Sequence, residues 1–313
     1  MSSQSLTGTD NADDLFGGAG LQGGDGNDRL FGEQGGDFLY GGAGADLIDG
    51  GEGDDTASYA LATTGVAASP ATGGTGGEAA GDVFVSIEDL YGSNFDDFLE
   101  GNDQANTILG MSGANTIRGL GGNDYLAGGN DNDTFFGGAG ADQIDGVGSF
   151  DYARYDDSPS GVTISLTGAQ GVGGDAAGDV LMNIEGLVGS AFADSLGGTV
   201  GSNDLQGGAG DDVLTGRWGD DTLDGGEGND SAVYSGARGD YMISFDGATA
   251  AYVIDDLRQG SPDSTDHVRN VETFVFANGA VAAGSVLDGN PTILVMGDDG
   301  KCDTRMMAGA TTC

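Results

Sequence analysis

A large apolar residue recurs every nine positions along three stretches of this chain, each time two places after an aspartate or asparagine. The nine-residue unit reads G-G-x-G-x-D-x-U-x, where U is the apolar residue and the acid stands at position six. The x-U-x triplet has the alternation of a short strand, with U on one face and its neighbours on the other. The glycines at positions one, two and four permit the backbone conformations of a tight turn. The pattern therefore predicts short strands joined by glycine-rich turns.

The repeats form three arrays, which are separated by segments without the pattern. Units of the first array begin at Gly8, Gly23, Gly32, Gly41 and Gly50, with a shorter stub over residues 17–22. Units of the second array begin, without interruption, at Gly92, Gly101, Gly110, Gly119, Gly128, Gly137 and Gly146. Units of the third array begin at Gly189, Gly198, Gly207, Gly216 and Gly225. The apolar U positions are Leu15, Leu30, Leu39, Ile48, Leu99, Ile108, Ile117, Leu126, Phe135, Ile144, Leu196, Leu205, Leu214 and Leu223.

Two consecutive units make one coil of turn, strand, turn and strand. Successive coils then stack as parallel strands about 4.8 Å apart, and the U residues of both sheets meet inside. We therefore predict an all-β fold, a parallel β-roll of the right-handed β-solenoid type. It comprises three stacked nonapeptide arrays with hairpin inserts and a C-terminal antiparallel cap.

Turns of units i and i+2 lie over one another on the same edge of such a roll, which brings their sixth residues together. Each pair of turns offers two carboxylates and several backbone carbonyls, an all-oxygen cage of about six ligands that suits Ca²⁺. Mg²⁺ requires a tighter octahedron and fits less well. Transition metals are disfavoured because the arrays contain no thiolate or imidazole. The arrays therefore predict several calcium ions, roughly 6–10.

The candidate metal ligands are the residues at position six. They are Asp28, Asp37, Asp46, Asp55, Asp97, Asn106, Asn115, Asp124, Asp133, Asp142, Asp151, Asp194, Asn203, Asp212, Asp221 and Asp230. We expect the best sites where two aspartates stack: Asp28/Asp46, Asp37/Asp55, Asp124/Asp142, Asp133/Asp151, Asp212/Asp230 and Asp194/Asp212. Pairs that include an asparagine lose one negative charge, so they should be weaker or empty.

The formal net charge is −42, from 51 acidic and 9 basic residues. An acid-rich chain usually indicates disorder, but here the acids stand in register, which favours a ligand role. Acids outside position six, such as Asp25, Asp131 and Glu227, are expected to be solvated charges. Stacked carboxylates about 5 Å apart repel by roughly 3 kcal/mol per pair, while each buried U side chain contributes only about 2–3 kcal/mol. The metal-free roll should therefore be unstable, and calcium should drive its folding.

Each array ends with an alanine at the U position and a tyrosine two places later, at Tyr59, Tyr155 and Tyr234. The first two tyrosines precede segments that resemble each other, GEAAGDVFVSIEDLYGSNFDD and GDAAGDVLMNIEGLVGSAFAD. We predict hairpins there, with Val162–Leu166 as one strand and Val180–Leu187 as the return strand of the second. The predicted boundaries are arrays at 8–58, 92–154 and 189–233, hairpin inserts at 59–91 and 155–188, a cap at 234–288 and a tail without regular structure at 289–313.

The three arrays resemble the RTX, or haemolysin-type, family of calcium-binding repeat proteins over roughly residues 6–281. The resemblance implies a parallel β-roll and a chain that is calcium-free and unfolded before export. It also implies secretion from a Gram-negative bacterium by a type I secretion apparatus, with an uncleaved C-terminal signal. The segment 234–288 resembles the antiparallel cap of β-rolls in this family, including those of secreted metalloproteases.

Other segments bear on where the chain works and on its partners. The start, MSSQSLTGTDNADD, has neither the basic nor the apolar segment of a signal peptide. No apolar run is long enough for a transmembrane helix. The strong negative charge makes nucleic acids and anionic membranes poor partners. Cys302 and Cys313 could form a disulfide outside the cell, or could be incidental thiols of a terminal segment.

Catalytic motifs are missing from the sequence. There is no H-E-x-x-H zinc motif, and the single histidine, His267, is expected to be a surface residue. The string beginning at Gly110 does not complete G-x-S-x-G. Carboxylate pairs of the glycosidase type are compatible with the composition, but every regularly spaced acid already has a calcium role. We therefore expect no enzymatic activity.

Two classes of function remain open. The first is a secreted calcium-binding protein with a structural, matrix or adhesive role, whose partner is a polysaccharide or the cell-surface matrix. The second is a non-catalytic carrier or secretion module of a type I exported enzyme, of the epimerase, lipase or protease type, encoded without its catalytic domain. Trp218, at position three of a turn, is expected to be exposed and could touch a partner. Ice binding would need a regular ladder of threonine and asparagine side chains. Only two pairs suggest such a ladder, Asn106-Thr107 and Asn115-Thr116.

Overall fold

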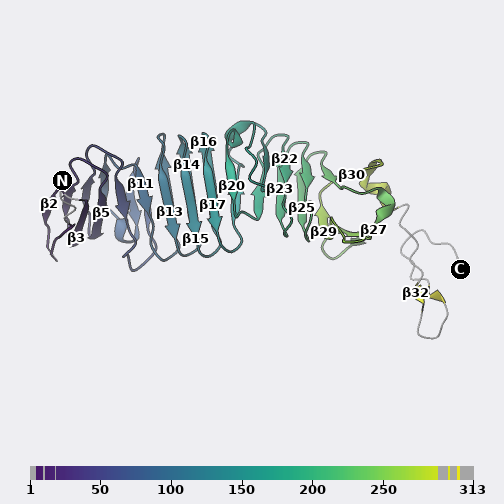
Figure 1. The fold of residues 1–313 in the computed structure, drawn as a ribbon, viewed down its shortest axis with the longest axis horizontal. Helices are drawn as coiled ribbons and strands as arrows, with labels where there is room; N and C mark the ends of the chain where they lie inside the picture. The colour runs from purple at the N-terminus through teal and green to yellow at the C-terminus, as the bar shows by residue number, and fades with distance from the viewer. Residues whose placement is uncertain (1–4, 10, 18, 288–294, 297–301, 304–313) are drawn as a thin grey trace. The chain divides into compact units, whose positions relative to one another are not determined.

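The structure is a computed structural model, and it describes residues 5–9, 11–17, 19–287, 295–296 and 302–303. The chain divides into two compact units: residues 1–155 with 168–184, and residues 156–167 with 185–313. Short strands stacked side by side dominate each unit (Figure 1). The described residues contain no α-helix, only the 3-10 turns η1 (Gly77–Ala79), η2 (Gly174–Ala176), η3 (Arg238–Asp240) and η4 (Ala283–Ser285). None of these is long or apolar enough to cross a bilayer.

The first unit is built from three runs of hydrogen-bonded strands. One sheet has the order β1 (Ser5–Thr7), β3 (Gly20–Asp25), β5 (Phe38–Ala43), β7 (Thr56–Ser58), β11 (Asp89–Tyr91), β13 (Thr107–Met111), β15 (Tyr125–Gly129), β17 (Gln143–Val147) and β20 (Val180–Met182). Facing strands form the order β10 (Val83–Val85), β6 (Leu47–Asp49), β4 (Arg29–Phe31) and β2 (Asp14–Phe16). A third run has the order β18 (Tyr152–Arg154), β16 (Thr134–Ala139), β14 (Thr116–Gly121), β12 (Phe98–Asn102), β8 (Ala67–Ser69) and β9 (Gly73–Gly76).

Strand register in this unit follows the two-unit period. Ile108 of β13 pairs in parallel with Leu126 of β15, which pairs in turn with Ile144 of β17. On the other sheet Ile117 of β14 pairs with Phe135 of β16. All five of these U side chains have exposed fractions of 0%, so the U positions form the core between the sheets. The predicted parallel β-roll is confirmed.

The second unit has the same construction and ends in antiparallel pairs. Its first sheet has the order β27 (Tyr241–Asp246), β28 (Ala251–Asp256), β29 (Thr265–Arg269), β25 (Thr222–Glu227), β23 (Asp204–Ala209) and β21 (Gly186–Val188). Its second has the order β19 (Thr163–Ser165), β22 (Ser195–Gly197), β24 (Val213–Thr215), β26 (Ser231–Val233), β30 (Thr273–Phe276) and β31 (Gly279–Ala282). β27–β28–β29 and β30–β31 are antiparallel, whereas β29 and β30 also extend the roll in parallel from β25 and β26. The antiparallel cap thus covers the last coil, whose open edge would otherwise be exposed.

The inserts are less like hairpins than the sequence predicts. In the first insert, β8 and β9 do form an antiparallel pair. In the second, Val180–Leu187 is not the return strand of a hairpin: β20 pairs in parallel with β17, and β21 pairs in parallel with β23. The reason lies in the residues, because Asp179 and Leu181 reproduce the acid and the apolar residue of a repeat, although the glycines at positions two and four are missing. This segment therefore adds a degenerate coil to the roll.

Most of the tail predicted at 289–313 lies outside the described residues. Within its described part, β32 (Val295–Met296) pairs antiparallel with β33 (Cys302–Asp303). Cys313, and with it the predicted choice between a disulfide and free thiols, lies outside the described residues.

Candidate metal sites between stacked turns

The candidate ligands at position six are buried in rows along the edges of the roll. Their exposed fractions do not exceed 5%, although they are almost all acids. Within a row, the backbone N–H of each position-six residue donates to the Oδ1 of the residue two units later. Asp124 donates to Asp142 at 2.9 Å, and Asp133 to Asp151 at 2.7 Å. The same bond joins the predicted pairs Asp28/Asp46, Asp37/Asp55, Asp194/Asp212 and Asp212/Asp230.

The second carboxylate oxygen has no protein partner in most of these residues. Buried Oδ2 atoms that accept no hydrogen bond belong to Asp28, Asp37, Asp46, Asp55, Asp124, Asp133, Asp142, Asp212, Asp221 and Asp230. A buried polar atom without a partner costs roughly 1–3 kcal/mol, and more when it is charged. A whole row of such atoms therefore indicates a ligand that satisfies them together.

The unpartnered oxygens lie beside the position-one glycines of their own turns. We call the space at such a glycine, between two stacked turns, a cradle, and a side chain in place of the glycine hydrogen would fill it. A Cβ placed on Gly32 would collide with Asp37 Oδ2 and with the carbonyl oxygen of Gly50, two units later. The same collision with an own-turn Oδ2 and a carbonyl two units later occurs at Gly23 and Gly207. Position one is thus glycine because its Cα borders a space lined by oxygen atoms from two stacked turns.

The chemistry of this space fits calcium. Its lining consists of carboxylate and carbonyl oxygens, which Ca²⁺ takes in sets of six to eight. No group of three or more His, Cys, Asp or Glu side chains is clustered to hold a metal anywhere in the described part of the chain. Side chains alone therefore do not complete a site, and the turn carbonyls have to supply the remaining ligands. This requirement explains why the turn geometry, and not only the acid, recurs in each unit.

Burial raises the pKa of several of these carboxyls in the metal-free roll. The pKa of Asp124 and of Asp221 rises to about 7, chiefly because burial disfavours the charged form, and the amide hydrogen bond offsets this only in part. For Asp133 and Asp142 the same cause raises the pKa to about 6. An acid that resists ionisation when alone and has a vacant oxygen is held in its charged form by a bound cation.

These shifts predict how pH affects the calcium-free chain. The folded state keeps protons on Asp124, Asp133, Asp142 and Asp221 up to about pH 6–7, whereas the unfolded chain releases them near pH 4. The folded state therefore binds more protons within this window, so its free energy of unfolding falls as pH rises. In calcium-free buffer we expect circular dichroism to show more β-structure at about pH 5 than at pH 8, and a higher calcium midpoint at the lower pH. A β-content that rises with pH without calcium would contradict this.

The predicted ligands that are asparagine have no vacant oxygen. Asn106 Oδ1 accepts from the Asn102 amide at 2.8 Å, and its Nδ2 donates to the Glu88 carbonyl at 2.7 Å. The Asn115 Nδ2 lies against Gly110, so a donor occupies the cradle. Asn203 repeats the arrangement of Asn106. These contacts support the prediction that cages with an asparagine are the weaker ones.

Two predicted aspartates also have both oxygens engaged. Asp97 accepts from the Ser93 amide at 2.6 Å and from the Val66 amide at 2.7 Å. Asp194 accepts from Ser190 and from the Val162 amide in the same way. Both stand in the first turn of an array, where a backbone amide of the same turn donates to the aspartate carboxylate. A calcium ion at these turns would have to displace hydrogen bonds that the later turns with an unpartnered aspartate Oδ2 lack.

The sequence prediction missed a set of acids outside the nonapeptides. Asp82, Asp179 and Asp266 extend three rows, because they accept the amides of Asp46, Asp142 and Asp221 at 2.9, 2.9 and 3.0 Å. Glu88 and Glu272 extend two more, by accepting the amides of Asp55 and Asp230 at 2.9 and 2.8 Å. The signal was present as a shared pattern, D-x-U-x-[SN]-[IV]-E, at 82–88, 179–185 and 266–272. Because the glycines at positions two and four are missing, these segments did not match the nonapeptide pattern.

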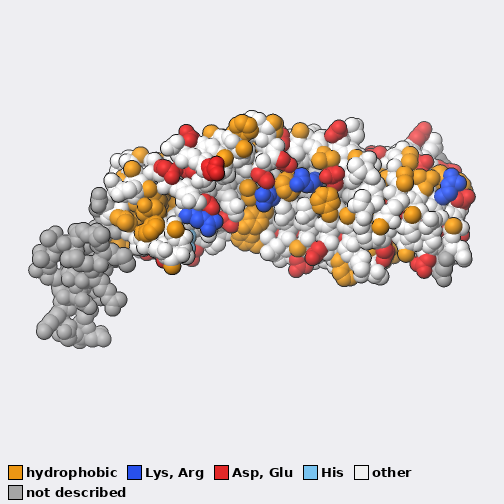
Figure 2. Space-filling view, turned by 180° about the vertical axis from the view of Figure 1, so that it is seen from behind, with side chains coloured by type: hydrophobic (Ala, Val, Ile, Leu, Met, Phe, Trp, Pro, Cys, Tyr) orange, Lys and Arg blue, Asp and Glu red, His pale blue; other side chains and the backbone are white. Residues whose placement is uncertain are grey.

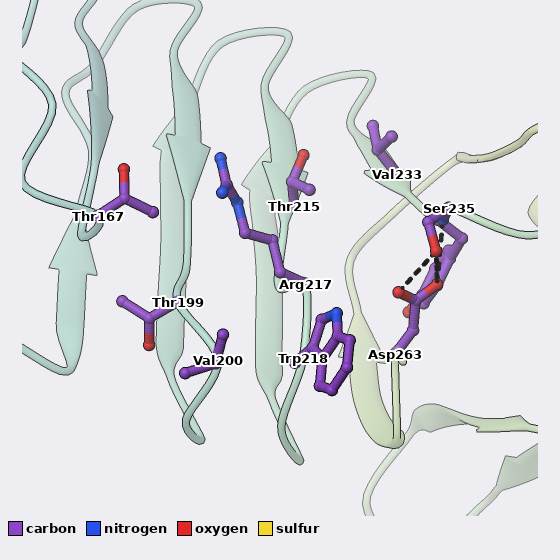
Figure 3. A pocket seen from close by; sticks show the side chains of 10 residues that line it. Thr167, Thr199, Val200, Thr215, Arg217, Trp218, Val233, Ser235 and Asp263 are labelled. Carbon is purple, nitrogen blue, oxygen red and sulfur yellow. Dashed lines mark hydrogen bonds between the residues drawn. The ribbon is translucent and has the colours of Figure 1, made fainter. Parts of the chain in front are cut away.

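A groove on the second unit brings together Trp218, Arg217 and Asp263, which lie outside the rows of position-six acids (Figure 3). It has a volume of about 630 Å³ and is lined by Thr167, Thr199, Val200, Thr215, Arg217, Trp218, Val233, Tyr234, Ser235 and Asp263. Trp218 is 54% exposed there, as the sequence predicts. Asp263 is neutralised at one end, since it accepts from Ser235 and from Arg258 at 2.9 Å. The single histidine, His267, lies exposed on β29, outside this groove.

Surface charge is consistent with acids that face inward. On the side drawn in Figure 2, acidic side chains are scattered among uncharged surface, and basic side chains form only a few small groups. The acids of the rows are buried, so they do not contribute to this surface.

Comparison with known proteins agrees with this geometry. The family model described as the RTX calcium-binding nonapeptide repeat (4 copies) matches residues 22–57, 91–126, 109–144, 118–152 and 197–232. A search of curated proteins finds no match. The matched stretches contain position-six acids of all three arrays, whereas the degenerate coils at 82–88, 179–185 and 266–272 lie outside them.

Proposed function

Because this chain carries RTX calcium-binding nonapeptide repeats, which bind several Ca²⁺ ions, we propose that it is a secreted repeat protein that folds on calcium outside the cell. The observation that carries this proposal is the row of buried Oδ2 atoms without partners. Such a row is unfavourable in the low calcium of a cytoplasm and favourable at the millimolar calcium for which extracellular modules are tuned. Folding would therefore follow export through a type I secretion apparatus.

The role we propose is structural or adhesive and non-catalytic, with a polysaccharide of the surrounding matrix as partner. The groove at Trp218 supports this choice. An exposed indole offers an apolar face to a sugar ring, and the flanking threonine hydroxyls and the Arg217 guanidinium offer hydrogen bonds to its substituents. Its volume is within the range of small-ligand sites. In the described part of the chain Arg217 makes no ion pair, so its donors are available.

Polysaccharide binding is tested by affinity electrophoresis in neutral and in uronate-containing gels, with calcium present and absent. We expect retardation only with calcium, and at least a tenfold weaker effect for Trp218→Ala. Val172→Ala, which removes another exposed apolar side chain, serves as the control and should bind like the parent chain. If no gel retards the folded chain, the result would favour the alternative that this chain is a carrier module of an exported enzyme, since such a module needs no ligand of its own.

A further inference from the structure

The rows of acids end in two different ways where an array stops. On one edge the last acid is fully hydrogen-bonded: Asp82 Oδ1 accepts the Asp46 amide at 2.9 Å, and its Oδ2 accepts the Tyr59 hydroxyl at 2.7 Å. In the second array Asp179 is held likewise by the Asp142 amide and by the Tyr155 hydroxyl, both at 2.9 Å. Here the last acid has no vacant oxygen, because the tyrosine hydroxyl takes the place of a ligand. The Oδ2 of Asp46 and of Asp142 still has no partner, but no carbonyl oxygen is among the atoms that a Cβ on Gly41 or Gly137 would meet first.

The opposite edge of the first array ends with an open cradle. Asp55 has an exposed fraction of 0%, its Oδ1 accepts the Asp37 amide at 2.7 Å, and its Oδ2 has no partner. A Cβ on Gly50 would collide with that Oδ2 and with the carbonyl oxygen of Ser86. This is the environment of Gly32 inside the array, except that Ser86 supplies the carbonyl that a repeat glycine supplies there.

The backbone conformation of Ser86 directs its carbonyl oxygen toward Gly50. Ser86 has φ 50°, in the left-handed region that is unfavourable for a non-glycine residue. Glu88, two residues later, accepts the Asp55 amide at 2.9 Å, as the next position-six aspartate would do. A turn without glycines thus supplies a carbonyl and a carboxylate to the last cradle. Because this turn is shorter than a nonapeptide turn, the longer side chain of glutamate spans the remaining distance.

The same arrangement closes the third array. Asp230 is fully buried with an unpartnered Oδ2, Asn270 has φ 50°, and Glu272 accepts the Asp230 amide at 2.8 Å. A Cβ on Gly225 would collide with the Asn270 carbonyl oxygen. In the second array Asn183, again with φ 50°, places its carbonyl against Gly146. Three independent segments adopting one strained conformation at one position indicate a shared purpose.

We propose that each of these glutamate-closed ends binds one further Ca²⁺, at Gly50–Asp55–Ser86–Glu88 and at Gly225–Asp230–Asn270–Glu272. The ligands would be the vacant aspartate Oδ2, the carbonyl of the left-handed residue, the glutamate carboxylate and carbonyls of the last glycine turn. This inference rests on the proposed calcium function and extends it to segments outside the recognised repeats. Since the closing turn supplies fewer oxygens, water completes the coordination, and these ions bind more weakly than those inside an array.

A crystal of the full chain grown with calcium, measured for anomalous scattering, tests the placement. We expect ions beside Asp55 and Asp230 and none between Asp46 and Asp82, where Tyr59 occupies the second oxygen of Asp82 and no carbonyl oxygen is among the atoms nearest to a Cβ on Gly41. Ions within the arrays but none at either glutamate-closed end would overturn this inference and leave the proposed function intact. A folded chain without any ion would overturn both.

Calcium stoichiometry in solution gives a second test. Glu88→Gln keeps an oxygen for the Asp55 amide and removes only the charge, so the fold should persist while one bound ion is lost. Glu88→Gln combined with Glu272→Gln should lose two. The matched control is Glu52→Gln, an exposed acid in the last turn of the first array whose carboxylate accepts only from Gln34. An unchanged stoichiometry in the folded double variant would refute the assignment.

Discussion

Removal of calcium is expected to abolish most of the β-structure of this chain. In the metal-free roll, rows of buried carboxylates lie against one another, and most of them have one unsatisfied oxygen. Their mutual repulsion is roughly 3 kcal/mol per stacked pair at an effective dielectric constant near 20. The core on each coil is little more than two U side chains, each worth about 2–3 kcal/mol. The 65 glycines add the ordering entropy of the most flexible residue.

Circular dichroism during a calcium titration of the chelated chain measures this. We expect a largely disordered spectrum without calcium, and a cooperative gain of β-structure with half-saturation at about 10⁻⁴–10⁻³ M Ca²⁺. Magnesium at the same ionic strength is the control and should restore little, since its tighter octahedron does not match the cradle. Full β-content in the chelated chain near neutral pH would show that the acids are satisfied without metal, and would refute calcium-driven folding.

The repeat pattern predicted the roll because its two constraints act locally. An apolar residue on every ninth position can be buried in one way only, with Ile108, Leu126 and Ile144 one above another. The acid two places earlier then has to fall in the same row, and the amide–carboxylate bonds between Asp124 and Asp142 follow from that register. Both features depend on neighbours along the sequence and on a fixed period, which is information that the sequence carries directly.

What the sequence did not reveal depends on contacts between distant segments. The hydrogen bonds of Tyr59 with Asp82 and of Asp55 with Glu88 join an array to the segment that follows it. The nine-residue period does not predict these contacts. The degenerate coils keep the acid and the apolar residue but replace glycine by a left-handed serine or asparagine. The same limit applies to Asp97, whose candidate role weakens once Ser93 and Val66 are seen to occupy its oxygens.

Neutralising Asp133 is expected to have the largest effect of any single charge change in the second array. Asp133 belongs to two cages: its Oδ1 accepts the Asn115 amide at 2.8 Å, and its own amide donates to Asp151 at 2.7 Å. It is 1% exposed, and its Oδ2 faces the cradle at Gly128 without a partner. Asp133→Asn keeps the acceptor for Asn115 but removes the charge from both cages. Asp133→Ala also removes the ligand atoms themselves.

Asp131 in the same turn provides the matched control. It stands at the fourth position, where most units have glycine, is exposed, and has φ 72°. Asn tolerates that left-handed conformation better than Ala does, so Asp131→Asn is the strain-free counterpart of Asp133→Asn. Its carboxylate accepts only the Gly113 amide at 3.2 Å, a bond that an asparagine oxygen can replace. The two variants therefore change net charge equally and differ only in whether the charge lies in a row.

Calcium titration of the two variants distinguishes register from bulk charge. Asp133→Asn should lose at least one bound ion and weaken the affected sites about tenfold, a cost of ~1.4 kcal/mol, and Asp133→Ala should lose more. The opposite edge, with Asp124 and Asp142, should respond less because Asp133 shares no hydrogen bond with it. Asp131→Asn should leave the midpoint nearly unchanged. Equal midpoints for the two variants would mean that total negative charge sets the affinity, and the assignment of position six as the ligand would then be wrong.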